Sequence, residues 1–481
     1  MEARYPSEAP FHPQERYPEY AFAETGEANA AYEGVRRVFF NLGLDRAAFG
    51  TAAWNPLGSL IAPGDSVVIK PNLIRESHGF KDSEWEQIIT HGSVIRAVLD
   101  YVFLALKGTG KVTVADGPQT DSDFEEICRR NGLFSVVEYF RRQGLTINLL
   151  DLRRDRWFQT GDVIYKRTKL PGDPNGYTTV ELGKQSEFCG YRLNGNFYGA
   201  DYDNSETAEF HHGERHAYIL CRTVMDANVV INIPKLKTHK KTGVTISLKN
   251  MVGINGYRNC LPHHTIGTPD AGGDEFNGVG MRLALQSRLI AVFKKVLGLT
   301  GGRGGGWARL VKRAGATAFG DSNKVVRSGN WHGNDTAWRM VLDLNRCLFL
   351  FDGEGKPRQR PLCYLTVVDG IIAGEGDGPM AADEMPAGLV VAGFNAAATD
   401  TVCAALMDFD YRKIPMLASV WKSPGHDLAS FAAEKIDCRS DVEGWNGTLA
   451  EIEKARHIPF RAHFGWRVIE RGNAGQGAGR G

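Results

Sequence analysis

The chain of 481 residues lacks a cysteine cluster, a long apolar run and an excess of either charge. Its eight cysteines are scattered without a Cys-x-x-Cys pair, so their spacing encodes neither a zinc ribbon nor an iron–sulfur cluster. No segment reaches the roughly 18 consecutive apolar residues of a membrane-spanning helix, and the first residues lack the basic and apolar regions of a signal peptide. We therefore expect a soluble, cytoplasmic protein without an iron–sulfur cluster.

The charge balance argues against a dedicated nucleic-acid binder. The chain carries 57 basic and 56 acidic residues, for a net charge of +1, whereas proteins that bind DNA or RNA usually show an overall basic excess. A glycine cluster at 301–306 lacks the Gly-Lys-Ser/Thr ending of a nucleotide P-loop. We expect no specific nucleic-acid partner, and any binding of anions must depend on local groups of basic residues.

Apolar periodicity predicts an α/β fold. Residues 66–70 and 111–115 have the composition of strands, and residues 93–106 between them place apolar side chains on one helical face. This order is typical of a parallel βαβ unit. Further strands are predicted at 146–151, 227–233, 363–368 and 387–393, a helix at 395–406, and antiparallel strands or long loops at 153–215. The predicted fold class is α/β, with a mixed, largely parallel sheet flanked by helices and a basic helical insertion.

Composition divides the chain into five segments. They are an N-terminal arm and helix (1–60), the first part of the α/β core (61–270), a basic glycine-containing insertion (271–335), the second part of the core (336–420) and a C-terminal extension with a flexible tail (421–481).

The insertion differs in charge from the rest of the chain. Between Arg282 and Arg327, ten Lys or Arg residues stand against one acid, Asp321, so this stretch carries about +9. Two helices are predicted in it, one over 283–297 and one from Trp307. Such a module could pack on the core, cover an anionic substrate as a lid, or contact anionic membrane lipids. The composition leaves these three roles open.

The most informative segment is 232–250, which crowds five lysines and a histidine behind the apolar run at 227–233. The run is predicted to be a buried strand that Pro234 ends, which places the lysines at the strand's exit. Crowded ammonium groups repel one another and lose hydration, so a cluster of this kind usually binds an anion such as phosphate or carboxylate. The alternative is a basic turn exposed to solvent.

Polar residues also follow the other predicted strands, and in a parallel sheet such residues converge on one crevice. The predicted substrate-binding residues are Lys70, Asn72, Lys235, Lys237, Lys249, Asn250 and Asp335. The predicted catalytic residues are Asp116, His91, His239, Asp369 and Glu375. Asp116 and Asp369 could also hold a Mg²⁺ ion beside the substrate, although each begins an Asp-Gly pair that could be an ordinary turn.

The two histidines are candidate bases. His91 stands at the predicted start of a helix, where Thr90 or Ser93 could be the N-cap, and His239 lies within the lysine cluster. Neighbouring lysines lower the proton affinity of a histidine and favour its neutral form, which can act as a base or a metal ligand.

Several of these motifs resemble the domain of unknown function 362 family. They are Val-Ile-Lys-Pro-Asn-Leu (68–73), Ile-Thr-His (89–91), Val-Ala-Asp-Gly-Pro (114–118), Asn-Ile-Pro-Lys-Leu-Lys-Thr-His (232–239), Thr-Gly-Val-Thr-Ile-Ser-Leu-Lys-Asn (242–250) and Val-Asp-Gly-Ile-Ile-Ala-Gly-Glu-Gly (368–376). Residues 331–339 and 342–346 resemble a longer form of the family. Some members carry a ferredoxin-like cysteine module, which this chain lacks. The resemblance implies that these residues form the site, but it does not imply a particular reaction. Longer members of this kind are similar to accessory proteins of polysaccharide or sugar-nucleotide pathways.

These observations lead to a main hypothesis and two alternatives. The main one is an enzyme that acts on an anionic small molecule, such as a phosphorylated sugar, a nucleotide or a carboxylate; the residues do not distinguish metal-assisted phosphoryl chemistry from acyl or glycosyl transfer. One alternative is a non-catalytic membrane-surface or assembly protein that uses the basic 282–327 module to bind anionic lipid or a partner. The other is an isomerase or racemase of a hydroxy acid, with His91 or His239 as the base.

Overall fold

The structure, a computed structural model, describes residues 2–160, 163–190, 195–201, 204–299, 325–422 and 426–473. The glycine cluster at 301–306 and the basic helix predicted from Trp307 lie outside these ranges. No helix in the described ranges combines the length and the apolar character needed to cross a bilayer.

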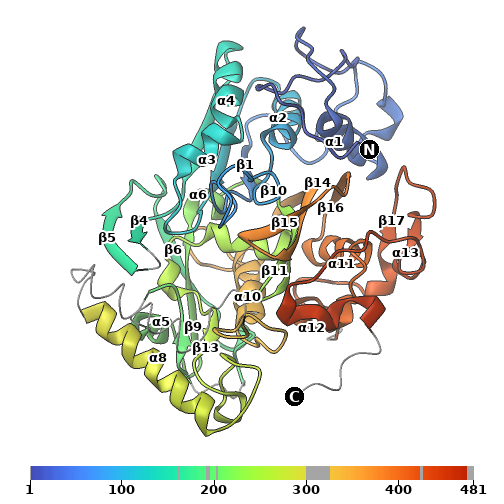
Figure 1. Cartoon of the computed structure of the whole chain (residues 1–481). Helices are drawn as coiled ribbons and strands as arrows, with labels where there is room; N and C mark the ends of the chain where they lie inside the picture. The colour runs from blue at the N-terminus through green and yellow to red at the C-terminus, as the bar shows by residue number, and fades with distance from the viewer. Residues whose placement is uncertain are drawn as a thin grey trace.

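Within the described residues, a nine-stranded sheet forms the centre of the molecule (Figure 1). Its main body is parallel and has the strand order β14–β10–β1–β2–β3. These strands are β14 (Cys363–Asp377), β10 (Val229–Ile233), β1 (Ser66–Pro71), β2 (Lys111–Asp116) and β3 (Ile147–Asp151). This arrangement confirms the predicted fold class, a mixed, largely parallel sheet flanked by helices.

The long strand β14 pairs with two successive strands on each edge. On one edge, β10 is followed after Pro234 by β11 (Lys235–His239), and both run parallel to β14. The Asp369 amide donates to the Pro234 carbonyl over 2.9 Å at the junction. On the other edge, β16 (Leu389–Gly393) and β15 (Ala381–Met385) run antiparallel, while β12 (Gly243–Thr245) pairs antiparallel with β11. Pro234 therefore ends β10, as predicted, but the chain stays in the sheet because β11 begins at Lys235.

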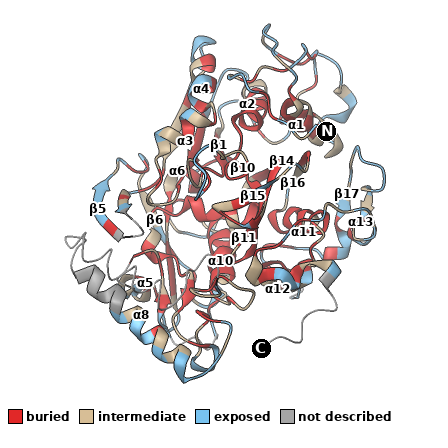
Figure 2. Ribbon diagram, viewed as in Figure 1, coloured by how far each residue is buried: buried red, intermediate tan, exposed pale blue. Residues whose placement is uncertain are grey.

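Side chains along β1 alternate between two hydrophobic cores, as the two-residue period of a strand requires. Val67 and Ile69 belong to the core that contains α1 (Ala30–Asn41), α2 (Gly92–Leu106) and α4 (Leu133–Arg142). Val68 belongs to the core that contains α10 (Ala337–Leu350), α11 (Ala396–Leu406) and α12 (Pro415–Lys422). Figure 2 shows the buried sheet between these helices. Helices thus cover both faces of the sheet. The carboxyl ends of the parallel strands are left to form a site.

The remaining elements surround this core. The strands are β4 (Asp155–Thr160), β5 (Val163–Lys169), β6 (Tyr177–Glu181), β7 (Phe197–Tyr198), β8 (His211–His212), β9 (Arg215–Cys221), β13 (His264–Thr265), β17 (Asp437–Cys438) and β18 (Gly447–Thr448). The helices are α3 (Phe124–Arg130), α5 (Ser205–Phe210), α6 (Arg222–Met225), α7 (Ser247–Asn250), α8 (Met281–Leu299) and α13 (Leu449–Ile452). The β4–β5 hairpin lies within 153–215 and confirms the antiparallel strands predicted there, and β6 and β8 in the same range pair with β9, which follows them.

The N-terminal arm packs on helix α2. Tyr5 and Tyr20 of the arm are buried. Arg96 of α2 is buried as well, and its guanidinium donates to the Pro10 carbonyl over 2.8 Å and to the Tyr20 hydroxyl over 2.9 Å. A buried guanidinium needs such partners, so α2 fixes the arm in a position where it can reach the carboxyl edge of the sheet.

Candidate functional site

The predicted lysines and aspartates of four strands meet at the carboxyl edge of the parallel sheet. Lys70 and Asp116 lie at the ends of neighbouring strands β1 and β2. Asp369 of β14 is directly paired with Lys235 of β11, and Lys237 follows two residues later. All five residues are buried. The alternative of a solvent-exposed basic turn is therefore excluded for Lys235 and Lys237.

Lys70 and Asp116 form the first of two ion pairs. Lys70 Nζ lies 2.7 Å from Asp116 Oδ1, and it donates to Asn250 Oδ1 over 3.0 Å. The other oxygen, Asp116 Oδ2, accepts from the Leu73 amide over 2.7 Å. Gly253 covers the pair so closely that a Cβ atom there would lie 2.0 Å from Asp116 Oδ1. The pair is thus enclosed, and only glycine fits at the position that seals it.

Asn72 and Asn250 connect this pair to the rest of the site. Asn72 Nδ2 donates to Asn250 Oδ1 over 3.1 Å, and Asn250 Nδ2 donates to Asn232 Oδ1 over 2.7 Å. Both predicted asparagines are therefore brought together with Lys70, where they fix one another and the ammonium group.

Lys235 and Asp369 form the second ion pair. Lys235 Nζ lies 3.0 Å from Asp369 Oδ2, which also accepts from the His91 amide over 2.9 Å at the start of α2. The Tyr5 hydroxyl accepts from Lys235 Nζ over 2.7 Å and donates to Asp369 Oδ1. The positive end of the α2 dipole further favours the carboxylate. Asp369 therefore holds the arm, the helix and the lysine at one point.

His91 is enclosed between two aromatic rings. Its ring centroid lies 4.0 Å from that of Tyr5 and 5.2 Å from that of Trp85, and both rings are nearly parallel to it. His91 Nδ1 accepts from the Ser93 amide over 3.1 Å, so the N-cap of α2 is His91 itself and not Thr90 or Ser93. Burial, with a smaller effect of Lys235, lowers the pKa of His91 well below its ordinary value. The lowered pKa favours the neutral ring, and the hydrogen bond that Nδ1 accepts places the ring proton on Nε2.

Lys237 differs from the two paired lysines. Its ammonium group donates to the Ile88 carbonyl and, over 3.4 Å, to Asn72 Oδ1, and among the described residues it contacts no carboxylate. Burial and the charges of Lys235 and Lys249 lower its pKa well below the ordinary lysine value.

Thr245 of β12 lies directly opposite Lys237 in the antiparallel pair. Cross-strand partners project from the same face of a sheet. The Thr245 hydroxyl is buried and makes no hydrogen bond within the described residues. An unneutralised ammonium group and an unsatisfied hydroxyl therefore stand side by side.

Lys249 of helix α7 is a second lysine without a partner. It is partly exposed, and within the described part of the chain its ammonium group makes no hydrogen bond or ion pair. Burial, followed by the charges of Arg258 and Lys70, lowers its pKa to about 7. Asp400 of α11 accepts from the Ser247 amide over 2.8 Å and the Leu248 amide over 2.9 Å, and so holds the start of α7.

His239 lies next to this cationic group. Its Nδ1 accepts from the amides of Lys241 over 3.0 Å and Thr242 over 3.2 Å, so the ring proton lies on Nε2. Burial and then the charge of Lys249 lower the pKa of His239 well below its ordinary value. The neutral ring can therefore donate a hydrogen bond from Nε2.

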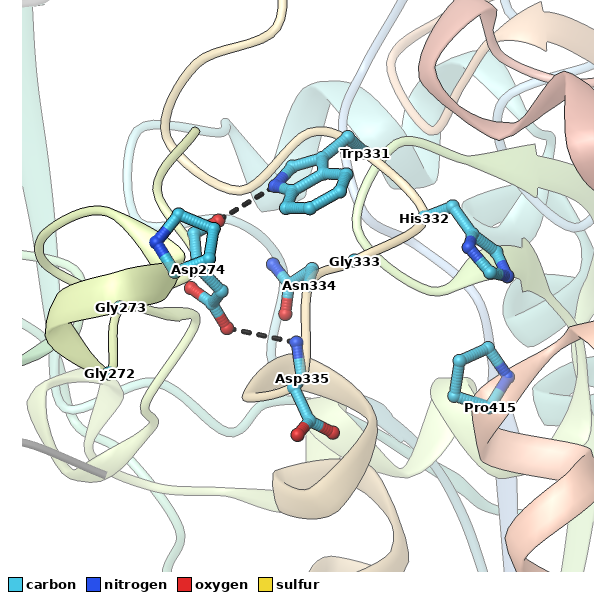
Figure 3. Close-up of a pocket in the computed structure, with 10 residues that line it drawn as sticks. Gly272, Gly273, Asp274, Trp331, His332, Gly333, Asn334, Asp335 and Pro415 are labelled. Carbon is cyan, nitrogen blue, oxygen red and sulfur yellow. Dashed lines mark hydrogen bonds between the residues drawn. The ribbon is translucent and has the colours of Figure 1, made fainter. Parts of the chain in front are cut away.

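The structure does not bring Glu375 or Asp335 into this cluster. Glu375 accepts from the Arg461 amide over 2.8 Å and pairs with its guanidinium at 3.4 Å. Asp335 lines a separate cavity of about 360 Å³ together with Asp274 and Trp331 (Figure 3). Its carboxylate accepts from Trp338 Nε1 over 2.7 Å and from Arg339 over 3.2 Å.

The polar groups around that cavity hold the loop at residues 331–335 in place. Figure 3 shows Asp274 accepting from Trp331 Nε1 at its carbonyl, over 2.8 Å, and from the Asp335 amide at its carboxylate, over 2.9 Å. His332 Nε2 bonds the Lys413 carbonyl over 2.8 Å. Asp335 therefore lies in the wall of this cavity, apart from the lysine cluster.

The predicted Mg²⁺ site stays a prediction that this geometry does not favour. Asp116 and Asp369 are each held in an ion pair with a lysine of their own. In the described ranges, no group of three or more His, Cys, Asp or Glu side chains is arranged to hold a metal ion.

Sequence reasoning missed Tyr5, Thr245 and Asp400. Tyr5 stands in an arm without periodicity, and Asp400 in a helix on the opposite face of the sheet. Thr245 lies within the lysine segment. A prediction of residues 235–245 as a hairpin with a tight turn would have placed Thr245 opposite Lys237, on the same face of the sheet.

Comparisons with known proteins agree with the motifs. A family model described as "Domain of unknown function (DUF362)" matches residues 67–180 and 172–405. A thylakoid-associated protein of Synechocystis sp. is 22% identical over 363 residues, which cover 76% of this chain and 69% of that protein. A solved structure from Thermotoga maritima aligns with 79% of this chain at 11% identity and a TM-score of 0.31, too low to bear on the fold. This chain spans 60% of that structure's chain.

Replacement of Lys235 and of Lys237 by methionine should change stability in opposite directions. Lys235→Met leaves Asp369 as an unpaired buried carboxylate, so the free energy of unfolding should fall by about 3–5 kcal/mol. Lys237→Met removes a buried ammonium group that no carboxylate neutralises, so the free energy of unfolding should rise by about 1 kcal/mol. Urea denaturation measures both values. An equal loss in the two variants would show that Lys237 is a structural lysine.

The pKa of Lys249 predicts a pH-dependent stability. Between about pH 7 and pH 10.5, an unfolded lysine keeps its proton while the folded Lys249 loses it, so the unfolded state binds more protons and rising pH favours folding. Lys249→Met removes this contribution. The stability advantage of Lys249→Met over wild type should therefore shrink from pH 7 to pH 9, by up to about 1.4 kcal/mol per unit. A constant difference would contradict the lowered pKa.

Proposed function

This chain belongs to the family described as domain of unknown function (DUF362), and from the site that this member builds we propose that it is an enzyme acting on an anionic small molecule. The substrate carries a phosphate or carboxylate group, as in a phosphorylated sugar, a nucleotide or a carboxylic acid. Lys237 and Lys249 bind this group. The proposal concerns the site at the carboxyl edge of the sheet, between β11, β12 and α7.

The observation that carries the proposal is the excess of positive charge at this edge of the sheet. Two of the lysines are neutralised by Asp116 and Asp369, but Lys237 and Lys249 are not. Removing an ammonium group from water without a counter-ion costs several kcal/mol. A bound anion would offset this cost for both lysines, and its charge would return their pKa values toward the ordinary range.

Neighbouring donors suit the oxygen atoms of such an anion. The Thr245 hydroxyl is buried beside Lys237 without a partner among the described residues, and His239 has a proton on Nε2. Phosphate and carboxylate oxygens accept several hydrogen bonds at once, and charge-assisted bonds to them are stronger than neutral ones. Lys70 and Lys235 support this arrangement from their ion pairs and act as positioning residues.

Lys249 is the proposed acid–base group. With a pKa of about 7 it exists in both protonation states at neutral pH, and it is the one of the four lysines that is partly exposed. A general acid or base works best when its pKa lies near the working pH. His91 is less suited to this role, because Tyr5 and Trp85 cover both faces of its ring. The racemase alternative with His91 as base therefore has no support from this geometry.

The comparisons support the family and leave the chemistry open. The name of the Synechocystis relative places that protein at the thylakoid and describes no reaction. The proposed chemistry of this chain therefore rests on its own side chains. Its cytoplasmic location and its part in polysaccharide or sugar-nucleotide metabolism stay predictions.

A thermal-shift screen tests the proposal. The ligands are nucleotides, nucleotide sugars, phosphosugars and hydroxy acids, each with Mg²⁺ and with EDTA. A ligand at about a hundred times its Kd should stabilise the folded state by about 2.7 kcal/mol. Lys237→Met and Lys249→Met should abolish the shift, since each removes one of the two cations that bind the anion. Binding of the anion should also weaken as pH rises above 7, because Lys249 loses its charge.

Lys356→Met is the matched control, because Lys356 is exposed and lies in another part of the fold. It should keep the full shift. A ligand that stabilises both site variants as strongly as wild type would contradict the proposed site, and a screen without any stabilising anion would contradict the proposed substrate class.

A further inference from the structure

Helix α8 (Met281–Leu299) presents an apolar stripe to solvent. Its members are Met281, Leu285, Leu289 and Val292, with exposed fractions of 89%, 57%, 48% and 61%. Spacings of four, four and three residues place these side chains on one face of the helix. The stripe is too regular to be a scatter of single exposed apolar residues.

The opposite face of α8 contacts the rest of the protein. Ser287 is buried and donates to Glu275 Oε2 over 2.7 Å. Figure 1 shows α8 along the outer side of the molecule, and Figure 2 shows exposed residues on its outward face. Packing on the core, one of the three roles considered for this module, therefore accounts for the inner face only.

Two arginines border the stripe. Arg282 and Arg288 are exposed, and at 100° per residue they fall on opposite sides of the four apolar residues. The sequence of α8 contains four basic residues and no acidic residue. Exposed apolar side chains with a cation on each side suit the interface of an anionic membrane, where the apolar side chains would enter the acyl region and the arginines would meet the headgroups.

We propose that α8 docks the protein on the surface of a membrane that contains anionic lipids, with the helix axis parallel to the bilayer. A second copy of the chain fits this face poorly. Two such stripes in contact would bring the arginines of both helices together, and α8 offers no carboxylate to neutralise them. The proposal does not depend on the proposed catalytic function, because it rests on other residues.

Co-sedimentation of the full chain with lipid vesicles tests the docking. The vesicles contain phosphatidylcholine alone, or phosphatidylcholine with about 30 mol% phosphatidylglycerol. Wild-type protein should bind the anionic vesicles at least about tenfold more tightly than the neutral ones, and high salt should weaken the binding because it screens the arginines.

Two double variants test the two parts of the surface. Leu285→Glu with Leu289→Glu, and Arg282→Glu with Arg288→Glu, should each reduce partitioning to anionic vesicles by at least about tenfold. Because these side chains are exposed, both variants should keep the melting temperature of wild type. Phe134→Glu, in α4, is the matched control at an exposed apolar position elsewhere, and it should bind like wild type.

Three results would overturn the proposal. Wild-type protein could stay in solution with both kinds of vesicle, or both double variants could bind as tightly as wild type. In the third, wild-type protein is a dimer in solution that Leu285→Glu with Leu289→Glu dissociates, which would make the stripe an interface between two copies.

Discussion

The neutralisation of buried lysines is the constraint on which this structure depends. An ion in a protein interior loses its hydration, and only close partners of opposite charge offset that loss. Lys70 and Lys235 have such partners in Asp116 and Asp369, at 2.7 and 3.0 Å. Lys237 and Lys249 lack carboxylate partners among the described residues. The fold thus accepts an unfavourable charge at one place, which is typical of a site that is completed by its ligand.

Distant parts of the chain hold this edge of the sheet in position. Tyr5 reaches it from the N-terminal arm, the start of α2 meets Asp369, and Asp400 fixes helix α7 from the opposite side. Gly253 closes over the Lys70–Asp116 pair at a distance that no other residue allows. Each support is a buried hydrogen bond or a close contact with few alternatives, so the lysine positions are fixed before any ligand arrives.

The structure gathers cations in two different environments, one buried and one exposed. The net charge of the chain is only +1, so cations can be concentrated at one place only if they are balanced at another. At the carboxyl edge of the sheet the cations are buried or partly buried and suit a small anion. On α8, Arg282 and Arg288 are exposed beside an apolar stripe and suit an extended anionic surface. Burial therefore separates the two proposed kinds of partner.

The sequence by itself determined the α/β class, the parallel core and the family, because hydrophobic period and motif order are local properties. It also identified Lys70, Lys235, Lys237 and Lys249 as a group. Only the tertiary structure decided which lysines are paired, since Asp116 and Asp369 reach their partners through strand order and register. It also added a second strand, β11, after Pro234, brought Tyr5 to Asp369, and placed Glu375 and Asp335 elsewhere. Such contacts join residues as far apart in the chain as Tyr5 and Asp369, 364 positions, and no local pattern encodes that pairing.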